Sequence, residues 1–386
     1  MTRSIGIDLH KSYAVVAERE EGSKEVRRSQ FKLTPHGVQM FIKSIDANCR
    51  IVMEATGNAF WLHDQLSPAA GEVILANPMQ LKAIAAARIK TDKVDAEIMV
   101  NLLAADFIPA IWVPSPEIRR QRSLVSHRIR LRRDATRCKN RVHAALIRNN
   151  VHVKSVFSAE GRSRLADAQI PFEDRIVVES DLRLLASLET EIKALDQELN
   201  AEAMEGPRKA EIQLAMTVPG MDVLGASLLV AVIGDVHRFS EPDKLASYLG
   251  LVPRLHQSGQ VQRYGHITKT GSPESRYILT QAAWAVVRHY GGTPLHDFFL
   301  RVAQRRGQAI AVTALARKLA TILWHVLTKQ EPCHYGRTAT ITRKLRRAAN
   351  HSVRYLSQLK DEDLELACEA LTDVYLAEEE GIQATG

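Results

Sequence analysis

The segment Arg88-Ile-Lys-Thr-Asp92-Lys-Val-Asp95-Ala96 places two carboxylates at the start of a predicted helix over residues 95–105. Because side chains three residues apart lie on one face of a helix, Asp92 and Asp95 would point to the same side. Adjacent carboxylates repel each other, which is tolerable where they share a divalent cation. An acidic helix start that complements the helix dipole is the simpler explanation. The segment alone leaves both interpretations open.

The composition is that of a multidomain globular protein whose charge is unevenly placed. The chain has 386 residues, 25% of them charged and 45% hydrophobic, enough for two or three domains with a buried core. Residues 116–150 hold ten Arg and one Lys against two acids, a net charge of +9, whereas residues 361–386 hold nine acids and no Lys or Arg. The basic block favours a phosphate-rich partner, DNA or RNA, over a solvated helix face, because guanidinium groups match phosphate oxygens.

Cysteine usage and hydropathy indicate a protein of the reducing cytoplasm. Cys49, Cys138, Cys333 and Cys368 are scattered, and none forms a CxxC pair or a Cys/His pair with metal-ligand spacing. No zinc site is therefore expected. The first residues enter a strand-like run directly, which argues against a signal peptide, and no apolar stretch reaches membrane-spanning length. No membrane partner is expected.

The first hundred residues predict a mixed sheet with helices on its faces. The strand candidates are short apolar runs bounded by turns, at residues 4–9, 13–18, 26–33, 50–54 and 73–76. The first three are joined by tight turns, which predicts an antiparallel meander. Helices are predicted at residues 35–45 and 60–66. Strands followed by alternating strands and helices are typical of an α/β domain.

Two further acids occupy strand positions that a purely structural interpretation explains poorly. Asp8 interrupts an otherwise apolar strand, and Glu54 ends another. A buried carboxylate is costly unless it is paired or bound to a metal. Neighbouring strands can present Asp8 and Glu54 side by side, with the Asp92/Asp95 turn above them. Four converging carboxylates would form an oxygen-ligand cage for one or two Mg²⁺ ions, the kind of site that supports phosphoryl transfer.

These acids belong to motifs that resemble a known family. The motifs are Gly6-Ile-Asp8-Leu-His-Lys11, Met53-Glu54-Ala-Thr-Gly57, Asn77-Pro78 and Lys90-Thr-Asp92-Lys-Val-Asp95-Ala96. In order and spacing they resemble the DEDD transposases of insertion-sequence family 110 (IS110/IS1111), the bridge-RNA-guided recombinases. The resemblance implies an N-terminal RuvC-like domain of RNase H-like fold. The catalytic, metal-binding quartet of that family falls on Asp8, Glu54, Asp92 and Asp95.

The middle of the chain is predicted to be helical. A proline-rich connector over residues 105–116 leads into one long helix over residues 117–149. Few aromatic residues interleave its arginines, so we expect phosphate contact rather than base stacking. The predicted nucleic-acid contacts of this helix are Arg119, Arg120, Arg122, Arg128, Arg130, Arg132, Arg133 and Arg137.

A second long helix, over residues 175–203, carries leucines at spacings of three and four. It either packs against the arginine-rich helix or forms a dimer seam. The coiled-coil insertion of the related transposases favours an oligomer contact. Beyond it, Pro219-Gly220 and Gly225 follow the pattern of a helix-hairpin-helix turn, whose backbone amides can bind a DNA phosphate. A tight corner between two helices is the alternative.

Residues 250–276 are glycine-rich, polar and basic, and predict a loop that holds a phosphodiester near Ser258. The cations available to it are Arg254, Arg263, Lys269 and Arg276. The pattern Gly-Leu-x-Pro-x-x-x-x-Ser-Gly, followed by Ile-x-Lys-x-Gly, resembles the C-terminal domain of the same transposases. The nucleophilic serine of that family falls on Ser258, ahead of its neighbours Ser272 and Ser275.

The resemblance therefore implies an α/β domain followed by mainly α regions. The predicted regions are a RuvC-like catalytic domain (1–115), an arginine-rich and coiled-coil region (116–205), a transposase domain with the serine (206–330), and a basic, then acidic, extension (331–386). In a homodimer or tetramer with composite sites, Mg²⁺-binding acids of one subunit would lie beside Ser258 of another. The serine would form a covalent 5′-phosphoserine link with donor or target DNA, selected through a noncoding bridge RNA.

Two other functions compete with this interpretation. A RuvC-like structure-selective nuclease would hydrolyse DNA with metal-activated water and would form no serine intermediate. A nucleic-acid-binding protein with an inactive catalytic site is the second alternative, although the intact acidic quartet argues against it.

Overall fold

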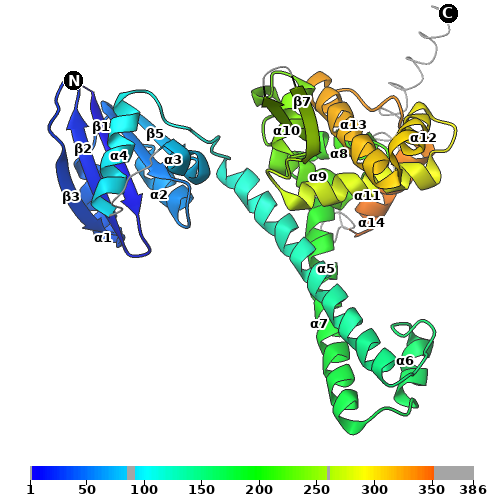
Figure 1. Cartoon of the computed structure of the whole chain (residues 1–386). Coiled ribbons are helices and arrows are strands. Elements are labelled where there is room, and N and C mark those ends of the chain that lie inside the picture. The colour runs from blue at the N-terminus through cyan, green and yellow to red at the C-terminus, as the bar shows by residue number, and fades with distance from the viewer. Residues whose placement is uncertain (1, 85–91, 259–260, 352–386) are drawn as a thin grey trace, which may run out of the picture. The chain divides into compact units, whose positions relative to one another are not determined.

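The computed structural model describes residues 2–84, 92–258 and 261–351, without the side chains of residues 92–94 and 255–264. The chain divides into two compact units, Met1–Ser115 and Pro116–Gly386 (Figure 1). The predicted acidic segment over residues 361–386 and the motif residues Lys90 and Thr91 lie outside the described residues.

The first unit is built on a five-stranded sheet with the strand order β3-β2-β1-β4-β5. Its strands are β1 (Arg3–Leu9), β2 (Tyr13–Glu20), β3 (Arg27–Lys32), β4 (Cys49–Glu54) and β5 (Glu72–Ala76). The pairs β1–β2 and β2–β3 are antiparallel, which confirms the predicted meander. The pairs β1–β4 and β4–β5 are parallel, as expected where helices connect the strands.

Helices cover both faces of this sheet, because alternate residues of each strand point to opposite sides. On one face, Ile7 and Met53 pack in the same cluster as residues of α1 (Pro35–Lys43) and α2 (Ala59–Leu66). On the other face, Val52 packs with residues of α3 (Pro78–Ile84) and α4 (Asp92–Ala104). The central strands β1 and β4 are therefore covered on both sides, and residues 6, 8, 52 and 54 belong to the α4 side.

Helix α4 lies unusually close to β1, and Gly6 makes this possible. A Cβ at residue 6 would overlap the carbonyl oxygen of Ala96 and would lie 2.8 Å from the backbone nitrogen of Val100. Both obstacles are helix backbone and cannot rotate away as a side chain can. Ala96 and Val100 pack on the neighbouring strand against Val15 in one apolar cluster. The small residues of this contact fix the depth of α4 on the sheet.

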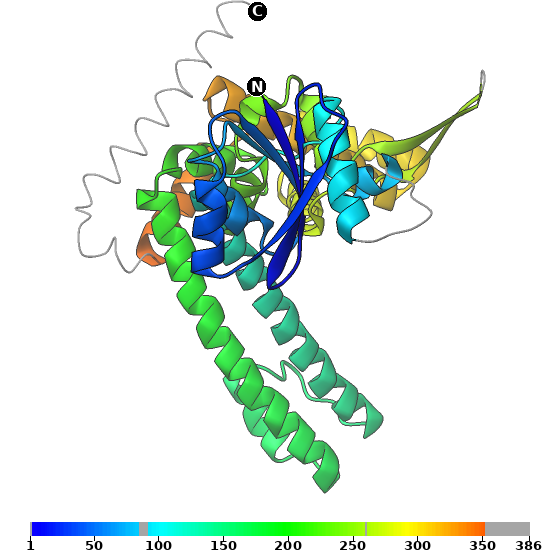
Figure 2. The same cartoon turned by 90° about the vertical axis from the view of Figure 1, so that its left-hand side faces the viewer.

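The second unit begins with a long helical hairpin. Helices α5 (Pro116–Arg148) and α7 (Phe172–Glu205) lie side by side and are joined through α6 (Ala159–Ala166) (Figures 1 and 2). Leu185 and Ile192 of α7 pack with Ala135 and Cys138 of α5. The spaced apolar residues of α7 thus pack against the arginine-rich helix of the same chain, which is one of the two alternatives predicted.

A helical body completes this unit. It contains α8 (Lys209–Thr217), α9 (Val223–Ile233), the 3₁₀ helix η1 (Val236–Arg238), α10 (Pro242–Tyr248), α11 (Pro273–His289), α12 (Pro294–Arg306), α13 (Gln308–Lys329) and α14 (Thr338–His351). By length and hydropathy α13 passes the test for a membrane span, which corrects the expectation that no stretch would. Its apolar residues, however, belong to the main core cluster of the unit, as those of a core helix do.

The turn between α8 and α9 is a buried corner rather than an open phosphate site. Gly220 has a φ of +79°, and a Cβ there would lie 2.7 Å from Cα of Ala282. The carboxylate of Asp222 caps α9 by accepting from the backbone N–H of Gly225 at 2.8 Å. Because this carboxylate already occupies the amide end of α9, the geometry favours the helix–helix corner.

A β-hairpin replaces the loop predicted over residues 250–276. Strands β6 (Pro253–Ser258) and β7 (Val261–Ile267) pair antiparallel and project from the helical body (Figure 2). The loop prediction was wrong because polar and charged residues dominate both strands. Their sequence therefore lacks the alternation of apolar and polar residues that normally indicates a strand.

Three arginines converge on the carboxyl end of α9, whose residues from Gly225 onward are all buried. Arg122 donates from Nε to the carbonyl of Ala231 at 2.7 Å and from Nη2 to that of Val232 at 2.8 Å. Arg208 and Arg238 donate to the neighbouring carbonyls of Val230, Ile233 and Gly234. The last carbonyls of a helix lack partners inside it, so these guanidinium groups complete the helix end.

Replacing Gly6 by Ala should loosen the first unit. The added methyl group meets the backbone of α4, and overpacking of this kind costs about 1–3 kcal/mol. We expect faster amide exchange in β1 and α4. Gly291→Ala is the control, since nothing lies within 4 Å of a Cβ there. Unchanged exchange in Gly6→Ala would show that α4 can move away at no cost.

Replacing Arg122 by Met should destabilise the second unit. It leaves the carbonyls of Ala231 and Val232 without their guanidinium donor, and each unsatisfied buried group costs about 1–3 kcal/mol. Arg132→Met removes an exposed arginine of the same helix and should change stability by less than about 0.5 kcal/mol. Urea unfolding of both variants measures the difference; equal losses would contradict the capping role of Arg122.

Candidate functional site

Two acids of the predicted quartet end neighbouring parallel strands. Asp8 is the last but one residue of β1, and Glu54 is the last residue of β4. The strands pair in parallel with Ile7 opposite Met53, so Asp8 and Glu54 follow in register. Because Gly6 and Val52 belong to the α4 side of the sheet, the residues two further along point to that side as well.

The start of α4 lies over the same end of the sheet. Near the beginning of β1, Asn101 of α4 accepts a hydrogen bond at 3.0 Å from Arg19, which pairs with Ser4. Further along β1, Ala96 lies on Gly6. The helix therefore runs antiparallel to β1, and its first turn, with Asp92 and Asp95, is directed towards the strand end that carries Asp8. The side chain of Asp92 lies outside the described residues.

His10 is a neighbour of this acidic site that the sequence interpretation did not single out. Its Nε2 lies 3.2 Å from Oδ2 of Asp8, and its ring stacks on Tyr13 with the centroids 4.3 Å apart. The side chain of Asp8 is 21% exposed, so solvent reaches it. The signal for His10 was present in the Gly-Ile-Asp-Leu-His-Lys motif, two residues after the acid.

The donor atoms of this site suit a hard divalent cation. Carboxylate oxygens are the ligands that Mg²⁺ and similar ions prefer. Asp8, Glu54 and Asp95 supply such oxygens from two strand ends and one helix start. Among the side chains that the structure describes, no three His, Cys, Asp or Glu stand close enough to hold a metal ion by themselves. A complete cage would therefore require Asp92, whose side chain is not described, or closure of the acids around the ion.

Ser258 is the last residue of β6 and pairs with Val261 of β7 near the turn of the hairpin. The side chains of Ser258 and Arg263 lie outside the described residues. The two competing serines have structural roles. Ser272 caps α11 by accepting from the backbone N–H of Ser275 at 3.1 Å, and Ser275 itself is fully buried.

Arg276, predicted to contact nucleic acid, joins the two segments that carry the hairpin. Its Nη1 donates to the carbonyls of Leu249 and Gly271, both at 3.3 Å, and to that of Thr270. Burial lowers the pKa of its guanidinium group. Leu249 precedes β6 and Thr270 follows β7, so one side chain from α11 ties both ends of the hairpin together.

The other two cations near the hairpin are exposed. Arg254 makes one long hydrogen bond, from Nη2 to the carbonyl of Thr268 at 3.4 Å. Lys269 has a φ of +56°, the left-handed region, at the point where the chain leaves the hairpin. Both side chains can therefore reach a partner in solution.

Most arginines of α5 have partners inside their own unit. The ion pairs between these arginines and other helices are Arg120–Glu202, Arg128–Asp196, Arg133–Glu274, Arg141–Asp181 and Arg148–Asp174. Arg137 pairs with Asp134 along the helix, and Arg122 donates hydrogen bonds to the carboxyl end of α9. Arg130 and Arg132 are exposed and form no ion pair with a residue that the structure describes. The density of arginine in α5 is thus largely explained by its packing against α7.

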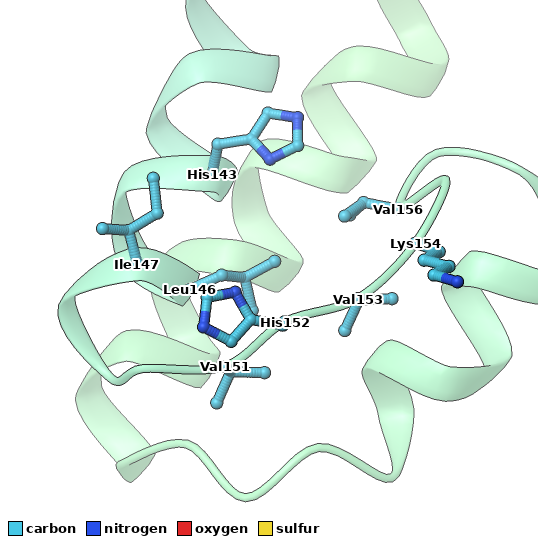
Figure 3. Close-up of a pocket in the computed structure, with 8 residues that line it drawn as sticks. All are labelled: His143, Leu146, Ile147, Val151, His152, Val153, Lys154 and Val156. Carbon is cyan, nitrogen blue, oxygen red and sulfur yellow. The ribbon is translucent and has the colours of Figure 1, made fainter.

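A cavity of about 250 Å³ lies at the far end of the helical hairpin, away from the predicted catalytic residues of this unit (Figure 3). Valines and other aliphatic side chains line it, together with His143, His152 and Lys154. No acid lines it, so its walls do not resemble an oxygen-ligand metal site.

Comparison with known proteins gives the family. A DEDD IS110 model described as "Transposase" matches residues 5–149, and a model described as "Transposase IS116/IS110/IS902 family" matches residues 212–298. Together the two spans cover more than half of the chain.

Individual relatives agree with these models. The chain is 29% identical over 343 residues to a probable family 20 transposase of Pseudomonas aeruginosa, covering 86% of this chain and 98% of that protein. It is 26% identical over 351 residues to the transposase for insertion sequence element IS1111A of Coxiella burnetii, covering 86% and 91%. It is also 29% identical over 292 residues to a pilin gene-inverting protein of Moraxella lacunata, covering 73% and 81%.

The strand order and pairing of the first unit agree with the RNase H-like fold that a DEDD domain implies. Acidic sites of DEDD transposases depend on a divalent metal, which matches the oxygen donors at the ends of β1 and β4. On both family models and on relatives aligned over most of its length, this chain belongs to the IS110 family of transposases, enzymes that cut and rejoin DNA.

Proposed function

We propose that this transposase cuts and rejoins insertion-element DNA through the acids Asp8, Glu54, Asp92 and Asp95 and the serine Ser258. One observation supports the acidic half above all others. Asp8 and Glu54 end adjacent parallel strands on the face that α4 covers, and the first turn of α4 is directed towards the same strand end. The motifs that contain Asp8, Glu54 and Asp92/Asp95 are therefore all directed towards the same end of β1 and β4.

Mg²⁺ is the cation we propose for this site. The four carboxylates would hold it, and His10, 3.2 Å from Asp8, would hold that carboxylate in place. When bound, the ion would lower the pKa of an oxygen nucleophile and offset charge on the scissile phosphate. Without it, the four acids would repel a DNA phosphate, so catalysis should require the ion.

Ser258 would act as the nucleophile. A serine hydroxyl is weak at neutral pH and requires activation, which explains why an acidic site and a serine would operate together. Its hydroxyl would lose a proton as Oγ forms a bond to phosphorus, the bond from phosphorus to the 3′ oxygen would break, and that oxygen would take up a proton to become the free 3′ hydroxyl. The resulting 5′-phosphoserine conserves the phosphodiester energy, so a 3′ hydroxyl can reverse the step and rejoin DNA without ATP.

The partners follow from the same proposal. Donor and target DNA are the substrates, and a noncoding bridge RNA would choose them by base pairing. The acids of one subunit would act with Ser258 of another in a homodimer or tetramer of cytoplasmic location. Arg119, Arg130, Arg132, Arg254, Arg263 and Lys269 remain our proposed backbone contacts, whereas the internal bonds of Arg122 and Arg276 argue for structural roles.

Ser258→Ala should abolish the covalent protein–DNA adduct and strand joining. The assay uses insertion-element DNA with the RNA that copurifies with the enzyme, and detects the adduct on a denaturing gel. Asp8→Asn and Glu54→Gln should abolish cleavage as well, because both remove a charged ligand. Ser272→Ala is the control and should keep the adduct, since that serine only caps α11. Undiminished cleavage by Ser258→Ala would instead indicate a nuclease that uses water.

Arg276→Gln should slow adduct formation by about tenfold or more without changing the salt dependence of DNA binding. The six-residue strand β6 spans about 20 Å, so loss of the bonds at its base is amplified at Ser258. Amide exchange at Thr268 and Lys269 should rise, since their N–H groups donate to the carbonyls of Val252 and Gly250 at the hairpin base. Arg254→Gln, the matched control, should keep the exchange pattern. If Arg276→Gln instead weakened the salt dependence of DNA binding, the result would indicate that Arg276 contacts a DNA phosphate.

A further inference from the structure

Helix α14 combines a buried anchor with an unusual charge. Residues 332–360, which include it, hold seven Lys and Arg and no acid. The helix lies outside both spans that the family models match. The matches to the family models therefore do not account for its charge.

One face of α14 fixes the helix to the protein. Ile341, Leu345, Ala348 and Ala349 are buried, the last two beside Met204 of α7. Two cations strengthen this anchor: Lys344 and Arg337 donate to the carbonyl oxygens of Met216, at 2.7 Å, and of His289, at 3.2 Å, respectively. Burial lowers the pKa of Lys344 to about 8.

The opposite face carries three arginines that the anchor does not use. Arg343, Arg346 and Arg347 are exposed and form no ion pair with any residue in the described ranges. At spacings of three and four they lie on one side of the helix. Like charges in this arrangement repel each other and destabilise a helix by a few tenths of a kcal/mol, roughly, for each pair. An external anion would remove this repulsion.

The other arginine-rich helices of this unit offer structural explanations that α14 lacks. The arginines of α5 mostly pair with carboxylates of α7. Those near the end of α12, Arg305 and Arg306, lie in its last turn, where cations favour the carboxyl end of the helix dipole. Arg343, Arg346 and Arg347 have neither a described carboxylate nor a position confined to the last turn.

The surroundings of α14 also select the kind of partner. An amphipathic basic helix can bind a membrane, but it does so by inserting its apolar face. Here that face is already buried against α7 and α8. What remains is a row of guanidinium groups, which match the phosphate oxygens of a nucleic-acid backbone. The chain belongs to a family that acts on DNA, which favours duplex DNA as the partner.

We propose that Arg343, Arg346 and Arg347 of α14 form a sequence-independent docking surface for the phosphate backbone of duplex DNA. This surface adds contacts outside the matched domains and does not depend on the serine or metal chemistry proposed above. It moves the main phosphate-binding arginines from α5, where the sequence predicted them, to a helix near the end of the described chain.

The test is the salt dependence of duplex binding by the full chain, measured by fluorescence anisotropy without divalent metal. In Arg343→Gln/Arg346→Gln/Arg347→Gln, the slope of log K against log salt concentration should fall by about 0.9 for each lost phosphate contact. The loss should be equal for duplexes of unrelated sequence. The triple Lys variant, which keeps the charges, should restore most of the affinity.

Lys24→Gln/Lys32→Gln/Lys43→Gln is the charge-matched control, because it removes three exposed cations from the first unit. A fall of slope in both triple variants would show a general charge effect and overturn the proposal. An unchanged duplex slope in the arginine variant would overturn it too. Loss of single-stranded RNA binding alone would then assign the surface to RNA, and loss of neither would exclude a nucleic-acid contact at these arginines. Thermal unfolding confirms that both variants are folded.

Discussion

The close approach of α4 to β1 at Gly6 is the contact on which the first unit depends. A helix that covers a sheet usually stands off by the thickness of two layers of side chains, but here backbone meets backbone. This depth determines how far the first turn of α4 stands above the ends of β1 and β4. The first turn of α4 is then directed towards the strand ends that carry Asp8 and Glu54. Folding and chemistry therefore share a single constraint.

In the second unit, most arginines of a strongly basic sequence bind partners inside the unit itself. Arginines of α5 pair with acids of α7, and three guanidinium groups complete the buried end of α9. Exposed ion pairs contribute little each, but several along one interface fix the register of two long helices. Arginine suits both tasks because its planar group donates in several directions at once. Charge density in sequence is thus a poor guide to charge available at the surface.

Sequence reasoning predicted the elements of the first unit because apolar residues alternate there and its motifs mark the strand ends. It predicted that Asp8 and Glu54 lie in strands because acids are conspicuous in apolar runs, and both residues do lie near strand ends. It missed the hairpin, whose polar strands carry no such signal. It also could not foresee the partners of Arg128 or Arg276, because Asp196 lies 68 residues from Arg128 and the carbonyls that Arg276 binds belong to loops. Pairings over such distances depend on tertiary structure.

The arginine–carboxylate pairs along α5 and α7 have a mechanical consequence. Helix α5, with 33 residues, spans about 50 Å. Its ion pairs with α7 make the two helices a rigid pair rather than a flexible connection. The exposed apolar side chain of Ile147 lines the cavity of Figure 3 near the far end of α5. The far end of the hairpin is therefore held at a fixed distance from the helical body of the same unit.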